Sequence, residues 1–158
     1  MDDRRKLPHW LRAWLPVAVC IGVIGLESTS LLGSDRTSAP LRWVYEGIFG
    51  PVDDARWAFL HFCIRKSGHF IGYGIVGLAW LRAWRLTLPR FRFLQDALLA
   101  VIGTALVASS DEFHQTFLPN RTGEFRDVLL DCCGAVAMQL VAYIVFRLFT
   151  PKQLAGPA

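Results

Sequence analysis

The feature that most constrains this chain is a set of four apolar blocks, each close to the length of a membrane-spanning helix. They cover about residues 10–26, 69–84, 94–110 and 128–149, and most of the charges lie between them. A helix needs roughly 20 predominantly apolar residues to cross a bilayer, within a range of about 17 to 25. The second and third blocks are at the short end, so we expect each to take some polar residues into the membrane.

These blocks predict an all-α membrane protein, a compact bundle of four transmembrane helices. Hydrophobic residues make up 53 % of the 158 residues. A soluble helical protein would show a polar face along each helix, whereas these blocks are apolar all round. We expect a single domain over residues 1–150, with its motif-bearing core at 60–140, followed by a disordered tail at 151–158. No small-residue cleavage site follows the first block, which we expect to be a retained anchor.

Lysine and arginine indicate the orientation. Ten of them lie at the two termini and between the second and third blocks, against seven on the other, longer connections. Because cytoplasmic segments carry the excess of these residues, we predict both termini in the cytoplasm and residues 27–65 and 113–126 outside. The predicted location is the plasma (inner) membrane, multi-pass. The net charge of +4 then reflects topology, and we predict the lipid bilayer, and no nucleic acid, as a partner.

Ionisable residues concentrate in SSDEFHQTFLPNRTGEFRD, residues 109–127, between the third and fourth blocks. Polar groups also stand at the start of the second block, where helical spacing places Lys66, His69 and Tyr73 on one side. The same spacing groups two further sets, Asp111, His114 and Gln115 at the end of the third span and Asp127, Asp131 and Gly134 at the start of the fourth. We therefore expect three span ends to bring these groups together at the outer surface.

A carboxylate facing lipid at membrane depth costs roughly 2.5–3.5 kcal/mol. We therefore expect these carboxylates to face a shared cavity and to pair with Lys66, Arg121 or Arg126. Pro119 and Gly123 bracket a turn, which lets Arg121 fold back over the cavity mouth. The structural alternative is that the ion pairs only hold the bundle together.

Small residues and cysteines in the spans suggest close helix packing. Gly68 and Gly72 form a GxxxG pair, with Gly74 and Gly77 beyond it, and such glycines let helix backbones approach each other. The four cysteines lie in or near spans, so we expect apolar thiols rather than disulfides.

A metal site is not predicted from the histidines. Three histidines on the outer side, His61, His69 and His114, have acids nearby, as a metal site would. No HExxH or comparable ligand spacing is present, however, and the sequence leaves any cofactor unknown.

Two stretches, KSGHFIGYGIVG and DEFHQTFLPNRTGEFRDVLLDCCGA, resemble the VanZ-like family of small bacterial membrane proteins. The shared pattern is Lys-x-x-His-x-x-x-Tyr at the start of one span, then Asp-Glu-x-x-Gln-x-Phe-x-Pro-x-Arg, and an Asp and a Gly opening the last span. The matching positions are Lys66, His69, Tyr73, Asp111, Glu112, Gln115, Phe117, Pro119, Arg121, Asp127 and Gly134. The family often has Asn at the position of Asp131, so this chain adds a carboxyl group there.

The resemblance implies an integral membrane protein that acts on or binds a cell-envelope ligand, either lipid-linked or related to peptidoglycan. The member that gives the family its name is associated with resistance to teicoplanin, a glycopeptide that binds peptidoglycan precursors outside the cell. The resemblance therefore also implies a link to antibiotic resistance.

Residue chemistry leaves different classes of function open. In an enzyme, Glu112 or Asp111 would act as general base or acid with His69 as its partner, and Lys66 and Arg121 would hold an anionic group. In a non-catalytic accessory protein, or in a small transporter subunit, the same groups would recognise a ligand without turnover. The predicted binding residues are Lys66, Tyr73, Gln115, Arg121, Asp127 and Asp131. The oligomeric state is left open by the sequence.

Overall fold

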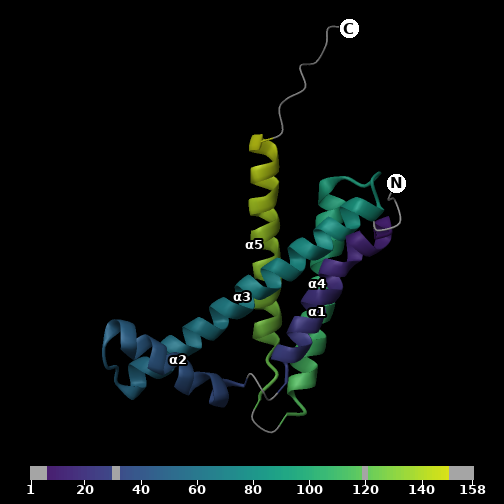
Figure 1. Cartoon of the computed structure of the whole chain (residues 1–158). Helices are drawn as coiled ribbons and strands as arrows, with labels where there is room; N and C mark the ends of the chain where they lie inside the picture. The colour runs from purple at the N-terminus through teal and green to yellow at the C-terminus, as the bar shows by residue number, and fades with distance from the viewer. Residues whose placement is uncertain (1–6, 30–32, 119–120, 150–158) are drawn as a thin grey trace, which may run out of the picture.

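The computed structural model describes residues 7–29, 33–118 and 121–149 (Figure 1). Within those ranges the chain forms helices joined by short connections, and no strand. The helices are α1 (His9–Glu27), α2 (Ser34–Phe49), α3 (Asp54–Thr87), α4 (Phe93–Gln115) and α5 (Phe125–Phe149). The prediction of an all-α fold is thus confirmed. Pro119 and the tail predicted at 151–158 lie outside the described residues.

Three helices of the described part are long and apolar enough to cross a membrane, namely α1, α4 and α5. They correspond to the first, third and fourth predicted blocks. The second block lies in the C-terminal half of α3, which does not reach the same length and hydropathy. Glycines, His69, Tyr73 and Arg82 interrupt the apolar run there.

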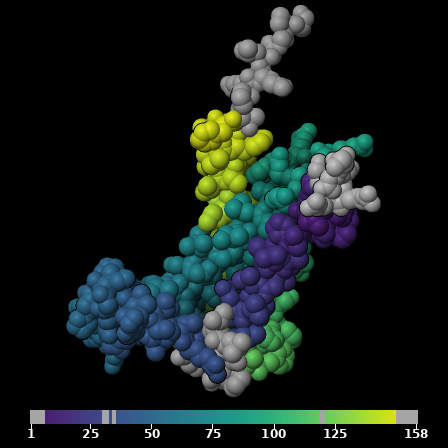
Figure 2. All heavy atoms as spheres, in the orientation of Figure 1, coloured from purple at the N-terminus to yellow at the C-terminus, as the bar shows by residue number. Residues whose placement is uncertain are grey.

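Helix α3 is the central helix, because α1, α2, α4 and α5 all pack against it, α5 most extensively. Its 34 residues make a rod of about 51 Å at 1.5 Å per residue, much longer than the roughly 30 Å of bilayer hydrocarbon. The C-terminal half of α3 lies among α1, α4 and α5, whereas the N-terminal half extends away from them with α2 at its side (Figures 1 and 2). Its neighbours shield the C-terminal half, which therefore needs less apolar surface than a helix facing lipid.

The segment after α1 was expected to be a loop, but residues 34–49 and 54–60 are helical. Asp53 caps α3 by accepting a hydrogen bond from the Arg56 backbone N–H at 2.9 Å. Arg42 joins α2 to this cap region, since its Nη1 donates to Asp54 Oδ1 at 2.7 Å and its Nη2 to the Val52 carbonyl at 2.6 Å. Hydropathy could not predict α2, because the helix has a polar first turn, no long apolar run and Pro40 in its interior.

Glycines determine how closely α5 approaches α3. A β-carbon on Gly74 would lie 2.6 Å from Met138 Cγ, and one on Gly77 would lie 2.7 Å from Ala135 Cβ. On the facing helix, a β-carbon on Gly134 would collide with the carbonyl oxygen of Phe70. The two backbones meet here without intervening side chains, as expected for Gly74 and Gly77.

The predicted GxxxG pair does not take part in this packing. A β-carbon on Gly68 or Gly72 would meet nothing within 4 Å. Both glycines instead line a small cavity beside Tyr73. Their missing side chains leave space at the candidate site, whereas the helix contact is made one turn further along α3.

Large apolar side chains cover the outside of the described helices. Leu26 is 63 % exposed, Leu94 77 % and Leu148 74 %. Exposed apolar surface of this extent indicates contact with another apolar medium. For helices of this length that medium is lipid. The four cysteines are free thiols, as predicted, but none is buried, since Cys20, Cys63 and Cys132 are partly exposed and Cys133 is exposed. The chain is therefore a membrane protein.

Candidate functional site

The candidate site lies where the middle of α3, the C-terminal end of α4 and the N-terminal end of α5 meet. Four of the buried polar side chains in the described residues gather here, namely Asp111, Glu112, Gln115 and Asp131. The helices bring together Lys66, His69, Tyr73, Asp111, Glu112, Gln115, Asp127 and Asp131.

Two contacts between basic and acidic side chains connect α3 to α5. Lys66 Nζ forms an ion pair with Asp127 Oδ1, and His69 Nδ1 lies 3.5 Å from Asp131 Oδ1. Lys66 and His69 are three residues apart on α3, and Asp127 and Asp131 are four residues apart on α5. The two contacts therefore lie one helical turn apart. The predicted pairing of Lys66 with a carboxylate is confirmed. Asp131 is completely buried.

Asp111 faces α3. Tyr73 donates its hydroxyl hydrogen to Asp111 Oδ2 at 3.0 Å, and Gln115 Nε2 donates to the same oxygen at 3.1 Å. Gln115 Nε2 also lies 3.5 Å from Glu112 Oε1. Tyr73 and Gln115 therefore hold the Asp111 carboxyl group in a defined orientation.

Glu112 is also buried, with 5 % of its surface exposed, but it points toward the connection between α4 and α5. Its Oε2 accepts a hydrogen bond from the Glu124 backbone N–H at 2.7 Å. Gly123 makes this possible, since a β-carbon there would collide with the Glu112 carbonyl oxygen and lie 2.7 Å from Thr116 Cγ2. Sequence reasoning treated Gly123 only as a turn residue and missed its contact with Glu112.

Arg121 folds back toward the site but binds carbonyl groups rather than acids. Its Nη2 donates to the Glu27 carbonyl at 2.9 Å and to the Thr29 carbonyl at 3.3 Å, and its Nη1 to Gln115 Oε1 at 3.4 Å. Neither Arg121 nor the exposed Arg126 forms an ion pair with a carboxylate of the described residues. Of the three expected partners for the carboxylates, only Lys66 pairs with one, and carbonyl groups at the end of α1 hold the guanidinium of Arg121 instead.

His61 and His114 lie apart from His69. His114 Nδ1 is 2.9 Å from Ser28 Oγ, and His61 Nε2 is 3.2 Å from Thr37 Oγ1. Burial, with a smaller contribution from nearby Arg65, lowers the pKa of His61. The three histidines therefore do not form one cluster. Ser28, which is buried, was not identified from the sequence.

Two polar cavities open at the site. The inner one, of about 30 Å³, lies beside His69, Tyr73 and Asp111. The outer one, of about 300 Å³, is lined by charged residues that include Arg65 and Lys66. His69, Gln115 and Arg121 line both cavities, so these side chains lie between the two.

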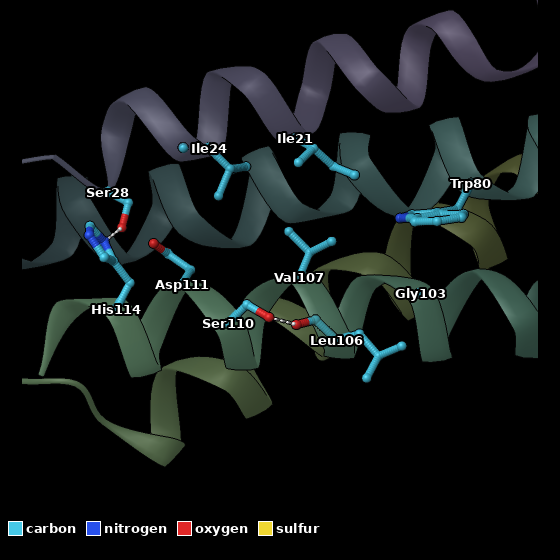
Figure 3. A pocket seen from close by; sticks show the side chains of 11 residues that line it. Ile21, Ile24, Ser28, Trp80, Gly103, Leu106, Val107, Ser110, Asp111 and His114 are labelled. Atoms are coloured by element: carbon cyan, nitrogen blue, oxygen red, sulfur yellow. Dashed lines mark hydrogen bonds between the residues drawn. The ribbon is translucent and has the colours of Figure 1, made fainter.

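An apolar groove of about 450 Å³ reaches the same site from the side (Figure 3). It runs between α1 and α4, which contact each other only slightly. Ile21, Ile24, Val107 and Trp80 form its apolar walls, whereas Ser28, Ser110, Asp111 and His114 are gathered at one end (Figure 3). Asp111 lines both the groove and the inner polar cavity.

Comparison with known proteins agrees with the sequence motifs and with the apolar helices. A family model described as VanZ/LLP1 matches residues 14–147, a range that includes every residue of the candidate site. No curated protein and no solved structure matches the chain. The match covers most of the chain, including both stretches that resemble the family. The protein is thus a member of the VanZ/LLP1 family.

Proposed function

We propose that this protein binds an amphipathic cell-envelope ligand at the outer face of the plasma membrane and acts on its anionic head group. In this proposal both termini are cytoplasmic and the C-terminal half of α3 serves as the fourth span. The observation that carries the proposal is the position of Asp111, where the apolar groove meets the inner polar cavity. A ligand with one apolar and one polar part matches that junction.

The groove suits a hydrocarbon chain. It opens between two helices whose outer surfaces face lipid, and its walls are mostly aliphatic (Figure 3). A chain that enters from the bilayer is already out of water, so its burial contributes little hydrophobic free energy. The groove therefore aligns the ligand, and contacts to the head group must supply most of the affinity.

The outer cavity suits an anionic head group. Arg65, Lys66 and Arg121 line it together and outnumber the two acids there, Glu124 and Asp127. Charge-assisted hydrogen bonds from such basic groups to phosphate or carboxylate are stronger than neutral ones. Phosphate and carboxylate are the groups expected on a lipid-linked wall precursor. Because glycopeptides bind such precursors, a change in teicoplanin susceptibility belongs to the same proposal.

Proton transfer is the chemistry that the buried groups can supply. Glu112 and Asp111 are adjacent, and both are buried, as is much of His69. Tyr73 and Gln115 orient Asp111, which leaves Glu112 as the carboxyl group with fewer side-chain contacts. A positioned acid or base contributes typically 10²–10⁴-fold to a rate.

The first test is mass spectrometry of envelope lipids and lipid-linked wall precursors incubated with the purified full-length protein. We expect wild type to change the mass of one component. Glu112→Gln, which keeps the side-chain shape, should lower the rate of that change by about 10²-fold or more. Retention of one component by both proteins without a mass change would establish binding without turnover. If neither protein retains or alters any component, the proposal is wrong.

A second prediction tests the groove. Ile21 points into it (Figure 3) and is 40 % exposed, whereas Val23, on the same helix and 47 % exposed, does not line it. Ile21→Trp should fill the groove and lower the amount of co-purified lipid-linked ligand about tenfold, equivalent to ~1.4 kcal/mol, as measured by mass spectrometry. Val23→Trp is the matched control and should leave that amount unchanged. Equal retention by the two variants would place the apolar part of the ligand elsewhere.

A further inference from the structure

We propose that His69, Glu112 and Asp131 bind one divalent cation of the first transition row, such as Zn²⁺ or Mn²⁺. Each residue comes from a different helix, α3, α4 and α5 respectively. One ligand atom from each lies within 4.8 Å of the other two. Nitrogen and carboxylate oxygen are the donor types that such ions take in proteins. Sequence reasoning predicted no metal here, because the three ligands are far apart in the chain.

Asp131 provides the strongest independent observation. Its surface is 0 % exposed, and neither of its carboxylate oxygens has a hydrogen-bond partner among the described residues. His69 Nδ1, which faces it at 3.5 Å, likewise lacks one. Buried polar groups are normally hydrogen-bonded, and the exceptions require an explanation such as an ion. These atoms point at each other across the space that a cation would fill.

The acidic composition of the site also favours a cation. Asp111, Glu112, Asp127 and Asp131 are buried or nearly so. Of the cations beside them, Lys66 is already paired with Asp127. Arg121 donates to carbonyl oxygens. These contacts do not neutralise the charge of the guanidinium but hold it away from the acids. Three acidic side chains thus share one His69 as their nearest basic partner, and a divalent ion would offset their charge.

Glu112 is able to act as a ligand without losing its structural contact, and with the ion bound Asp111 is the carboxyl group that remains for proton transfer. Its Oε2 is held by the Glu124 N–H at 2.7 Å, while its Oε1 has only the long contact of 3.5 Å to Gln115. Zinc lies about 2.0–2.2 Å from nitrogen or oxygen ligands, so that neighbouring ligand atoms are about 3.4 Å apart around a tetrahedral ion. Small side-chain rotations would bring the three atoms to that spacing.

Three protein ligands leave a coordination position open, as in catalytic rather than structural sites. His69 lines the inner and outer cavities, so the open position would face the space in which we place the head group. Imidazole favours a transition ion over Mg²⁺ or Ca²⁺. Ion binding itself does not depend on the proposed function, and it is measured without any envelope ligand.

The test uses the full-length protein, purified in detergent with its affinity tag removed and then treated with a chelator. Wild type should take up one equivalent of Zn²⁺ or Mn²⁺, measured by elemental mass spectrometry and calorimetry, and excess Mg²⁺ should not displace it. Asp131→Asn and His69→Gln should bind at least about tenfold more weakly. Asp96→Asn, which changes a buried carboxyl group outside the cluster, is the matched control and should bind as wild type does.

Thermal unfolding separates loss of the ion from loss of the fold. Without an ion, Asp131→Asn should be at least as stable as wild type, because it removes an uncompensated charge. Added Zn²⁺ should raise the unfolding temperature of wild type and of Asp96→Asn, but not that of Asp131→Asn. Failure of folded wild type to take up either ion would overturn the proposal. Uptake by Asp131→Asn and His69→Gln equal to that of wild type would overturn it as well.

Discussion

Gly134→Ala is expected to lower the free energy of unfolding by about 2 kcal/mol or more, because overpacking costs typically 1–3 kcal/mol and occasionally more. The new β-carbon would collide with the Phe70 carbonyl oxygen on α3. The contact is with backbone, which cannot rotate away as a long side chain can, so α3 and α5 would have to separate. The better helix propensity of alanine, up to about 1 kcal/mol, offsets only part of this cost.

The consequence reaches the candidate site. The ion pair between Lys66 and Asp127, and the contact between His69 and Asp131, both span α3 and α5. Separation of these helices would weaken both, so Gly134→Ala should also reduce retention of the ligand and of a bound ion.

Thermal and denaturant unfolding in detergent measure the effect. Gly22→Ala is the matched control, since a β-carbon on Gly22 would meet nothing within 4 Å. That variant should be as stable as wild type, or more stable by up to about 1 kcal/mol. If Gly134→Ala and Gly22→Ala unfolded alike, the close contact of α3 with α5 would not exist in the protein.

The second large effect is expected for Lys66→Ala. This change leaves Asp127, whose side chain is only 16 % exposed, without its ion-pair partner. Removing one partner of a fully buried pair costs about 3–5 kcal/mol, and partial exposure of this pair to solvent reduces the expected loss to about 2 kcal/mol. Loss of the ligand is expected as well, because Lys66 lines the outer cavity.

A double variant separates the two roles of Lys66. Replacing both partners with apolar residues, Lys66→Met with Asp127→Leu, removes the uncompensated charge, and such replacements are often neutral or stabilising. The double variant should therefore unfold within about 1 kcal/mol of wild type but still fail to retain an anionic ligand. A double variant as unstable as Lys66→Ala would show that Lys66 stabilises the fold by something other than its pairing with Asp127.

Local pattern was sufficient to predict much of this protein. The lengths of the apolar blocks predicted α1, α4 and α5, because crossing lipid requires about 20 apolar residues whatever the rest of the chain does. Helical spacing placed Lys66 and His69 on one face and Asp127 and Asp131 on another, and the structure brings these two faces together. The match to the VanZ/LLP1 family agrees with the motifs in those same segments.

Other features had no local signal. Helix α2 has no long apolar run and contains Pro40, so only its contacts, such as that of Arg42 with Asp54, distinguish it from a loop. Arg121 was expected to meet an acid, but it is the end of α1 that lies next to it. Gly68 and Gly72 have the spacing of a packing motif, yet they face a cavity.

The sequence by itself thus determined that α1, α4 and α5 are apolar helices of membrane-spanning length and which side chains share a face of each helix. Both depend on composition and on the 3.6-residue period, which are local properties. Only the tertiary structure decided which faces meet, which glycines lie at a contact, and that His69, Glu112 and Asp131 converge. These depend on how helices distant in sequence pack together. Residues of the same type, such as Gly72 and Gly74, therefore have different roles, because different parts of the structure lie opposite them.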